Sequence, residues 1–248
     1  MITDSHRSNW EEMSTLDPLW AILSTKEKRF GGWDLDEFLR TGIDEIAQIM
    51  DKAGELSLPL SRKRALDFGC GIGRLTRALQ SYFDECCGVD ISSEMLARAA
   101  ALNPKCEFRI NLDVNLHIFP DNHFDFVYSN LVLQHQPDRE AIISYIGEML
   151  RVLAPEGLLV FQLPCNMPLR NRIQGRRRLW SLLRALGVSA DLLYNRLKLS
   201  PICMNWMPEN ETKRHISRFG GRALRSEAHQ QPGEPFVSCV YYCSKENK

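Results

Sequence analysis

The stretch Leu66-Asp-Phe-Gly-Cys-Gly-Ile-Gly-Arg-Leu75 places three glycines, Gly69, Gly71 and Gly73, between an apolar strand pattern and a helical pattern. Glycine permits a tight turn at positive φ, and its missing Cβ lets a ligand approach the backbone closely. The free N–H groups at the start of the following helix add hydrogen-bond donors. This segment therefore predicts a ligand-binding turn at the end of a strand.

The next strand pattern, ECCGVD (residues 85–90), ends on an acidic residue. Asp90 lies 90 − 69 = 21 residues after the first glycine, where α/β folds place the carboxylate that meets two ribose hydroxyls. The loop spacing is G-x-G-x-G and not the dinucleotide pattern G-x-G-x-x-G. Asp67, inside the strand end, would repel a pyrophosphate and attract an ammonium. Ammonium, ribose and adenine occur together in S-adenosylmethionine.

Strand and helix patterns alternate on both sides of this segment. Because the apolar runs are nearly continuous, they predict parallel strands that are buried on both faces. Strands are expected at residues 64–69, 85–90, 106–111, 124–130 and 157–164, with helices at 74–83, 92–103 and 137–155. The second of these helices has Ser92 or Ser93 as its expected N-cap. The order predicts a doubly wound, mostly parallel α/β sheet.

The C-terminal end departs from this rhythm. A helix pattern at residues 208–221 ends on two glycines, and the segments 224–230 and 236–245 then read as an antiparallel strand pair. The connection Gln231–Pro235 has turn composition. An antiparallel hairpin is therefore expected at the end of the chain.

Four segments in this order resemble the class I, seven-stranded S-adenosylmethionine-dependent methyltransferases. They are LDFGCGIGRLTRAL, GVDIS, FPDNHFDFVYSNLVLQH and LRVLAPEGLLVFQLP, and the resemblance spans about residues 64–164. It implies a seven-stranded Rossmann-like sheet, closed by the C-terminal antiparallel hairpin, and S-adenosylmethionine as the cofactor.

The resemblance also implies roles for individual residues. Asp67 would lie near the methionine amino group, and the backbone of the glycine loop would pass along the methionine portion. Asp90 would accept from both ribose hydroxyls, with Ile91 and Met95 against the adenine. Asn111 stands where the family often has an acid that reads the adenine amino group. The cofactor-binding set is thus Asp67, Gly69, Gly71, Gly73, Asp90, Ile91, Met95, Asn111 and Ser129.

His135, in LVLQHQPD, is the candidate catalytic residue. It follows the fourth strand, on the side where this fold class places the methyl acceptor. A neutral oxygen acceptor needs a base close to the attacking atom, and a histidine can supply it. The alternative is a histidine that bonds a nearby carboxylate and closes the site. No Cys/His cluster has metal-ligand spacing, so no metal is expected.

Two regions lie outside the expected core. Residues 1–60 contain three tryptophans and two amphipathic patterns, TLDPLWAILS and DLDEFLRTGIDEIAQIM, and are expected to form an N-terminal helical cap. Residues 61–164 are expected to form the cofactor-binding core. Residues 165–206 are expected to form a basic helical insertion over the acceptor site, and residues 207–248 to complete the core.

The insertion carries seven arginines and one lysine against a single acid, Asp191, so its charge is 8 − 1 = +7. The whole chain has 31 basic and 31 acidic residues, so the remainder carries about −7. The arginines could bind an anionic group of the acceptor, rest on a membrane surface that holds a lipid-linked acceptor, or face water on a helical cap. A nucleic-acid partner is not expected, because a second basic domain and an aromatic stacking platform are missing.

Composition narrows the class further. With 44% hydrophobic and 25% charged residues, the chain matches globular proteins and not disordered ones. Eight cysteines without a C-x-x-C pair favour reduced thiols, and the first residues carry no apolar signal core. A cytoplasmic protein without a transmembrane segment is expected.

The leading interpretation is a methyltransferase for a small-molecule acceptor, through O-methylation of a sugar or another secondary metabolite. Two alternatives stay open. One is a protein that binds S-adenosylmethionine without catalysis as a partner of another enzyme. The other is a dinucleotide-dependent oxidoreductase, which the loop spacing and Asp67 disfavour.

Overall fold

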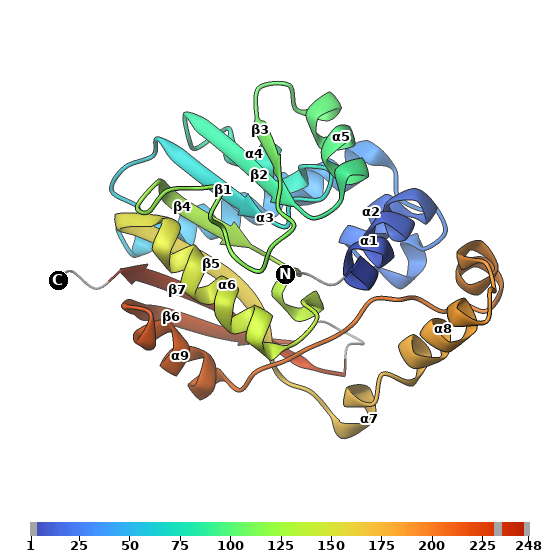
Figure 1. Cartoon of the computed structure of the whole chain (residues 1–248). Coiled ribbons are helices and arrows are strands. Elements are labelled where there is room, and N and C mark those ends of the chain that lie inside the picture. The colour runs from blue at the N-terminus through green and yellow to red at the C-terminus, as the bar shows by residue number, and fades with distance from the viewer. Residues whose placement is uncertain (1–3, 231–234, 246–248) are drawn as a thin grey trace.

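The computed structural model describes residues 4–230 and 235–245. A seven-stranded sheet runs through it in the order β3-β2-β1-β4-β5-β7-β6 (Figure 1). The strands are β1 (Arg64–Phe68), β2 (Glu85–Asp90), β3 (Glu107–Ile110), β4 (Phe124–Ser129), β5 (Leu153–Asn166), β6 (Gly221–His229) and β7 (Val237–Lys245). Neighbours from β3 to β5 pair in parallel, whereas β7 runs against both β5 and β6. The predicted fold class, with its C-terminal antiparallel pair, is confirmed.

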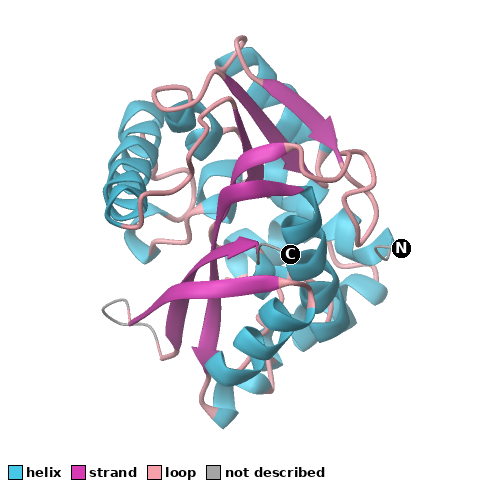
Figure 2. Ribbon diagram, turned by 90° about the vertical axis from the view of Figure 1, so that its left-hand side faces the viewer, coloured by secondary structure: helices cyan, strands magenta, loops and turns pink. Residues whose placement is uncertain are grey.

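Helices cover both sides of the strands (Figure 2). The longer helices are α1 (Asp4–Leu16), α3 (Leu35–Glu55), α4 (Arg74–Leu79), α5 (Ser93–Leu102), α6 (Arg139–Val152), α8 (Gly175–Ala185) and α9 (Glu209–Arg218). Short turns of helix are α2 (Pro18–Ile22), η1 (Lys26–Lys28), η2 (Leu133–His135), α7 (Leu169–Arg172) and η3 (Leu192–Arg196). The expected N-cap of α5 is confirmed, because the Ser92 hydroxyl accepts from Met95 N at 3.2 Å.

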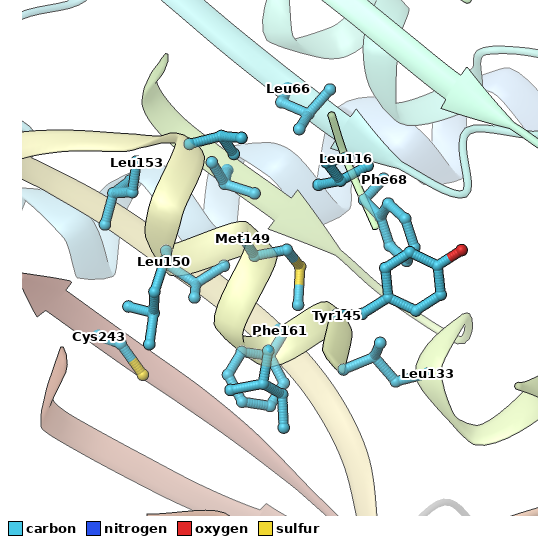
Figure 3. Packing of buried hydrophobic residues seen from close by; sticks show 14 of the residues in the cluster. Leu66, Phe68, Leu116, Leu133, Tyr145, Met149, Leu150, Leu153, Phe161 and Cys243 are labelled. Carbon is cyan, nitrogen blue, oxygen red and sulfur yellow. The ribbon is translucent and has the colours of Figure 1, made fainter. Parts of the chain in front are cut away.

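Successive strand residues point to opposite faces of the sheet, and helices bury both of these faces. Leu66 and Phe68 pack with Tyr145 and Met149 of α6 in one apolar cluster (Figure 3). The same cluster includes Ile216 of α9. On the other face, Ala65 packs with side chains of α3 and α4. The near-continuous apolar pattern of the strands follows from this cover on two faces.

The N-terminal region and the insertion share a third apolar cluster. Trp180 of α8 and Tyr194 of η3, both about 1% exposed, pack with Met13 of α1 and Phe38 of α3. The insertion is therefore anchored to the N-terminal helices by a core of its own. Figure 1 shows α7 and α8 at the edge of the molecule, away from the sheet.

Two local predictions need correction, and a third falls mostly on residues that the structure does not describe. The pattern TLDPLWAILS does not form one helix, because α1 ends at Leu16 and α2 begins at Pro18. The carboxylate of Asp17, between them, accepts from the N–H groups of Phe30 and Gly31. Helix α4 is shorter than the predicted 74–83. The turn expected at Gln231–Pro235 lies, apart from its last residue, outside the described residues.

Candidate active site

A cavity with about 720 Å³ of space opens at the carboxyl ends of β1, β2 and β4. Strand order reverses between β1 and β4, and α/β sheets bind ligands at such a switch point. The wall is formed by strand ends, by η2, by α6 and by both N-terminal helices. Its residues are His6, Trp10, Ala21, Ile22, Phe68, Gly69, Gly71, Val89, Asp90, Ile91, Met95, Asn111, Asn130, Leu131, Val132, His135, Gln136 and Tyr145.

The glycine loop forms one wall in a conformation that favours glycine. Gly69 and Gly71 have φ of +79° and +53°. A Cβ on Gly71 would lie 2.5 Å from Ile22 Cδ1, and one on Gly69 would collide with the Val132 side chain. Both neighbouring side chains also line the cavity. Because these two glycines have no side chains, Ile22 and Val132 can pack directly against the backbone of the loop.

Asp90 closes the loop from the end of β2. Its carboxylate accepts from Gly71 N at 2.9 Å and from Ser92 N at 3.0 Å. Burial raises the pKa of the Asp90 carboxyl, and the two backbone N–H groups offset part of that shift. The sequence predicted this acid, and the structure places it on the cavity wall together with Ile91 and Met95.

Asn111 has a fixed amide orientation. Its Nδ2 donates to Asp113 O at 2.8 Å and to the Tyr145 hydroxyl at 3.4 Å, and that hydroxyl donates to Asp113 O at 2.6 Å. Because Nδ2 is used inside the protein, Oδ1 is the amide atom left for an amino group of a ligand. Figure 3 shows Tyr145 beside Phe68, and their ring centroids lie 4.5 Å apart.

Three of the predicted cofactor-binding residues do not line the cavity. Gly73 is the N-cap of α4, and the Ser129 hydroxyl donates to Phe68 O at 3.2 Å. Asp67 is buried, and its Oδ2 accepts from the Thr76 hydroxyl at 2.6 Å while Oδ1 has no hydrogen-bond partner. Burial raises the pKa of Asp67 to about 7. These three residues therefore support the glycine loop from inside the fold.

A buried polar cluster lies next to the loop. Glu45 of α3 accepts from the Tyr128 hydroxyl at 2.8 Å, from Asn130 Nδ2 at 2.7 Å and from the Arg74 guanidinium at 2.9 Å. Arg74 is only 2% exposed, so the ion pair satisfies a charge that would otherwise be costly to bury. The cluster holds Asn130 on the cavity wall. The sequence pattern of α3 did not predict that Glu45 would contact the cavity wall.

His135, the predicted catalytic residue, lies on the cavity wall with both ring nitrogens engaged. Nδ1 is 2.7 Å from Cys203 O and must carry the proton, because a carbonyl only accepts. Nε2 lies 3.1 Å from Gln134 Nε2 and accepts from it. Burial lowers the pKa of His135 to about 4, so the ring is neutral near pH 7. Its partners are a carbonyl and an amide, not the carboxylate that the closing role assumed.

The N-terminal helices form the part of the wall that the site residues predicted from sequence did not include. His6 and Trp10 come from α1, and the Trp10 ring meets His135 edge-on with centroids 5.7 Å apart. Helix α1 is fixed to the start of α5 by Glu11, which accepts from the Ser92 hydroxyl at 2.7 Å and from Ser93 N at 2.9 Å. Burial alone would raise the pKa of Glu11, but these hydrogen bonds bring it below its usual value.

A second, smaller cavity with about 240 Å³ of space adjoins the first and shares His6 and Trp10 with it. The rest of its wall consists of Asn9 of α1 and of four residues of the insertion, Arg177, Pro201, Ile202 and Cys203. Arg177 donates through Nε to Pro201 O at 3.3 Å and forms no ion pair within residues 4–230 and 235–245. The same part of the chain holds no cluster of metal ligands and no helix long and apolar enough to cross a membrane.

Comparisons with known proteins agree with this arrangement. A family model described as a methyltransferase domain matches residues 66–161. A 2-methyl-6-phytyl-1,4-hydroquinone methyltransferase of Synechocystis is 34% identical over 128 residues, 50% of this chain and 39% of the relative. A trans-aconitate 2-methyltransferase of Variovorax paradoxus is 33% identical over 147 residues, 52% of this chain and 55% of the relative. The chain thus spans less than two thirds of the length of these relatives.

Solved structures share the fold over nearly the whole chain. Magnesium protoporphyrin IX methyltransferase of Synechocystis, solved with bound SAH, has a TM-score of 0.61 at 16% identity, with 97% of this chain and 98% of that chain covered. A S-adenosylmethionine-dependent methyltransferase of Clostridium acetobutylicum has a TM-score of 0.62 at 14% identity, with 92% and 98% covered. At these identities the likeness concerns the fold.

Proposed function

We propose that this chain methylates an oxygen of a small-molecule acceptor. By its methyltransferase domain and its fold, it belongs to the class I S-adenosylmethionine-dependent methyltransferases. The observation that carries the proposal is the cavity itself. One end joins the glycine loop to Asp90, and the other joins His135 to the N-terminal helices and the insertion. A nucleoside cofactor and a separate acceptor can thus meet at one switch point.

The residues at the first end fit S-adenosylmethionine. Val132 and Ile22 pack so closely on Gly69 and Gly71 that neither position has room for a Cβ, and the Asp90 carboxylate can accept from ribose hydroxyls. The Asn111 Oδ1 suits the adenine amino group, and the unpartnered Asp67 Oδ1 leaves an acceptor beneath the loop. When bound, this cofactor supplies an electrophilic methyl group on a sulfonium. The chain's own tasks are alignment and exclusion of water.

The second end supports an anionic acceptor. Arg177 and His6 line the smaller cavity, and His135 lines the adjoining larger one. Both histidines are neutral near pH 7, because burial lowers the pKa of each to about 4. An unpaired guanidinium suits a carboxylate or phosphate. A carboxylate is already ionised near pH 7 and needs no base, whereas a hydroxyl acceptor does. His135, with both nitrogens engaged, then orients the acceptor wall and does not remove a proton.

The proposal extends to the insertion, residues 165–206, as a cap on the acceptor site. Its wall of the smaller cavity and its shared core with α1 support that role. Its basic and apolar side chains also favour contact with a membrane surface that carries a lipid-linked acceptor. All eight cysteines are free thiols, which supports a reducing compartment such as the cytoplasm.

The test is transfer of a labelled methyl group from S-adenosylmethionine to three acceptor panels: tricarboxylates, hydroquinones and sugars. We expect a methyl ester in the tricarboxylate panel, identified by mass spectrometry of the product. Calorimetry with S-adenosylmethionine accompanies the assay. Binding without transfer to any panel would favour the non-catalytic partner, and heat with NAD instead would favour the oxidoreductase.

A further inference from the structure

A row of leucines on α8 faces solvent. Leu179, Leu182 and Leu186 are 45%, 58% and 72% exposed, and their i, i+3, i+7 spacing puts them on one side of the helix. The preceding residues Leu169 and Ile173 are 74% and 59% exposed. Five large aliphatic side chains, two at α7 and three at α8, are therefore exposed to solvent. We call them the leucine face.

This exposure is not the result of a poorly anchored helix. Trp180, on another side of α8, is 1% exposed in the cluster shared with the N-terminal helices. Arg184 pairs with Glu12 of α1 and donates to Val188 O at 2.9 Å. Helix α8 is thus held on its inner side, and the leucine face points away from that side.

Arginines flank the leucine face. At 3.6 residues per turn, Arg176 lies about 60° to one side of Leu179 and Arg178 about 100° to the other. Arg170 and Arg178 form no ion pair in the part of the chain that the structure describes. The insertion has one acid, and this residue, Asp191, accepts from Asn195 Nδ2 at 2.7 Å. An apolar strip with unneutralised basic edges suits an anionic surface that has an apolar interior.

We propose that the leucine face docks on the surface of an anionic lipid bilayer. Protein partners are bound mainly through aromatic and arginine hot spots, where leucine is under-represented. The leucine face has no aromatic residue, since Trp180 and Tyr194 are buried. A bilayer accepts aliphatic side chains in any register, while arginine stems extend along the apolar surface and their guanidinium groups reach the phosphates.

Docking in this way places the smaller cavity close to the bilayer. Arg177, which lines that cavity, lies on the side of α8 opposite Leu179, so about one helix diameter, ~10 Å, separates the cavity wall from the lipid. The inference deepens the proposed function. The reason for docking, access to an acceptor at the bilayer, rests on that function. The docking itself follows from exposure and charge and needs no turnover.

The experiment is sedimentation of the full chain with two kinds of vesicle: phosphatidylcholine alone, and phosphatidylcholine mixed with phosphatidylglycerol. We expect binding to the mixed vesicles only, weakened by added salt because the arginine contribution is screened. Substitution of Leu179, Leu182 and Leu186 by Gln should lower the partition coefficient at least tenfold. The double variant R170Q/R178Q should lower it about fivefold.

Matched controls are Ile43→Gln on α3, where the side chain is 53% exposed, and Arg40→Gln on the same helix. Both should bind as the wild type does. S-adenosylhomocysteine affinity and thermal melting show that every variant folds, so a failed cofactor site is distinguished from failed docking. Absence of vesicle binding, or equal binding by the triple variant, would overturn the proposal. So would a wild-type dimer in sedimentation equilibrium that the triple variant abolishes, since a second copy would then cover the face.

Discussion

The two ends of the cavity are built in different ways. The cofactor end uses backbone and short side chains at consecutive strand ends, from Gly69 to Asn111. The end proposed for the acceptor combines His6 of α1 with His135 and with Arg177 of the adjoining smaller cavity, and His6 lies more than a hundred residues before the other two. The first end depends on local turn geometry, whereas the second depends on tertiary packing between a cap and an insertion. Changes at one end should therefore leave the other intact.

The largest expected effect is at the glycine loop. Gly71→Val should lower S-adenosylmethionine affinity more than a hundredfold, because valine is strained at φ +53° and its Cβ would meet Ile22. The matched control is Gly187→Val in the insertion, where φ is +84° and nothing lies within 4 Å. Calorimetry on both folded variants checks the difference. Equal affinities would show that backbone strain, and not the cavity, explains any loss.

Asp90→Ala should lower the same affinity about a hundredfold. Two charge-assisted hydrogen bonds to the ribose, at ~1.5–3 kcal/mol each, would be lost together with the support of Gly71 N. Asp113→Ala is the control, because its carboxylate is exposed while its backbone carbonyl keeps the contact with Asn111. A loss smaller than about fivefold at Asp90 would count against the ribose role.

Acid should destabilise the acceptor end. Burial lowers the pKa of His135 in the folded protein to about 4, whereas the pKa in the unfolded chain is near 6.5. Between these two values the unfolded chain binds a proton that the folded protein does not bind. The free energy of unfolding therefore falls as the pH drops from 6.5 to 4. Between pH 7 and pH 5, the loss of unfolding free energy that His135 causes is about 2 kcal/mol. Urea unfolding at both pH values should show the full loss in the wild type and in the exposed control His117→Gln. In His135→Gln the loss should be smaller by that amount, because His6, whose pKa burial also lowers to about 4, still contributes its own share. A parallel loss in all three would remove His135 as the cause.

Arg177→Gln should raise KM for a tricarboxylate acceptor about tenfold and leave kcat and S-adenosylmethionine affinity nearly unchanged. The loss is confined to KM because the guanidinium binds the acceptor in ground and transition state alike. Arg178→Gln, one residue away and outside the cavity wall, should be silent with a soluble acceptor. Equal KM in the two variants would refute the anion subsite.

The sequence predicted more of the cofactor end than of the acceptor end, because the first depends on local turns and the second on tertiary packing. Strand and helix order, the glycine loop, Asp90 and Asn111 depend on patterns within a few residues, so they could be predicted. His6, Trp10 and Tyr145 lie on the cavity wall only because separate helices dock there. Asp67 and Ser129 were predicted from their position at strand ends, but the alternation of strand side chains turns them into the fold.

The packing also changes which tests of the insertion are useful. Deletion of residues 165–206 would uncover Met13 and Phe38, because Trp180 and Leu193 share their cluster. Such a deletion would disturb the N-terminal helices together with any acceptor role. Point substitutions on the two sides of α8, Arg177 inside and the leucine face outside, separate these effects.

A crystal structure of the chain with S-adenosylhomocysteine is the most direct test of the central claim that the cofactor occupies the locally built end. The account predicts the ribose hydroxyls on the Asp90 carboxylate, the adenine between Ile91 and Asn111, and the amino-acid portion along Gly69 and Gly71. Arg177 and the smaller cavity should be untouched by the ligand. Density for the ligand at the Arg177 end, or outside the cavity altogether, would contradict it.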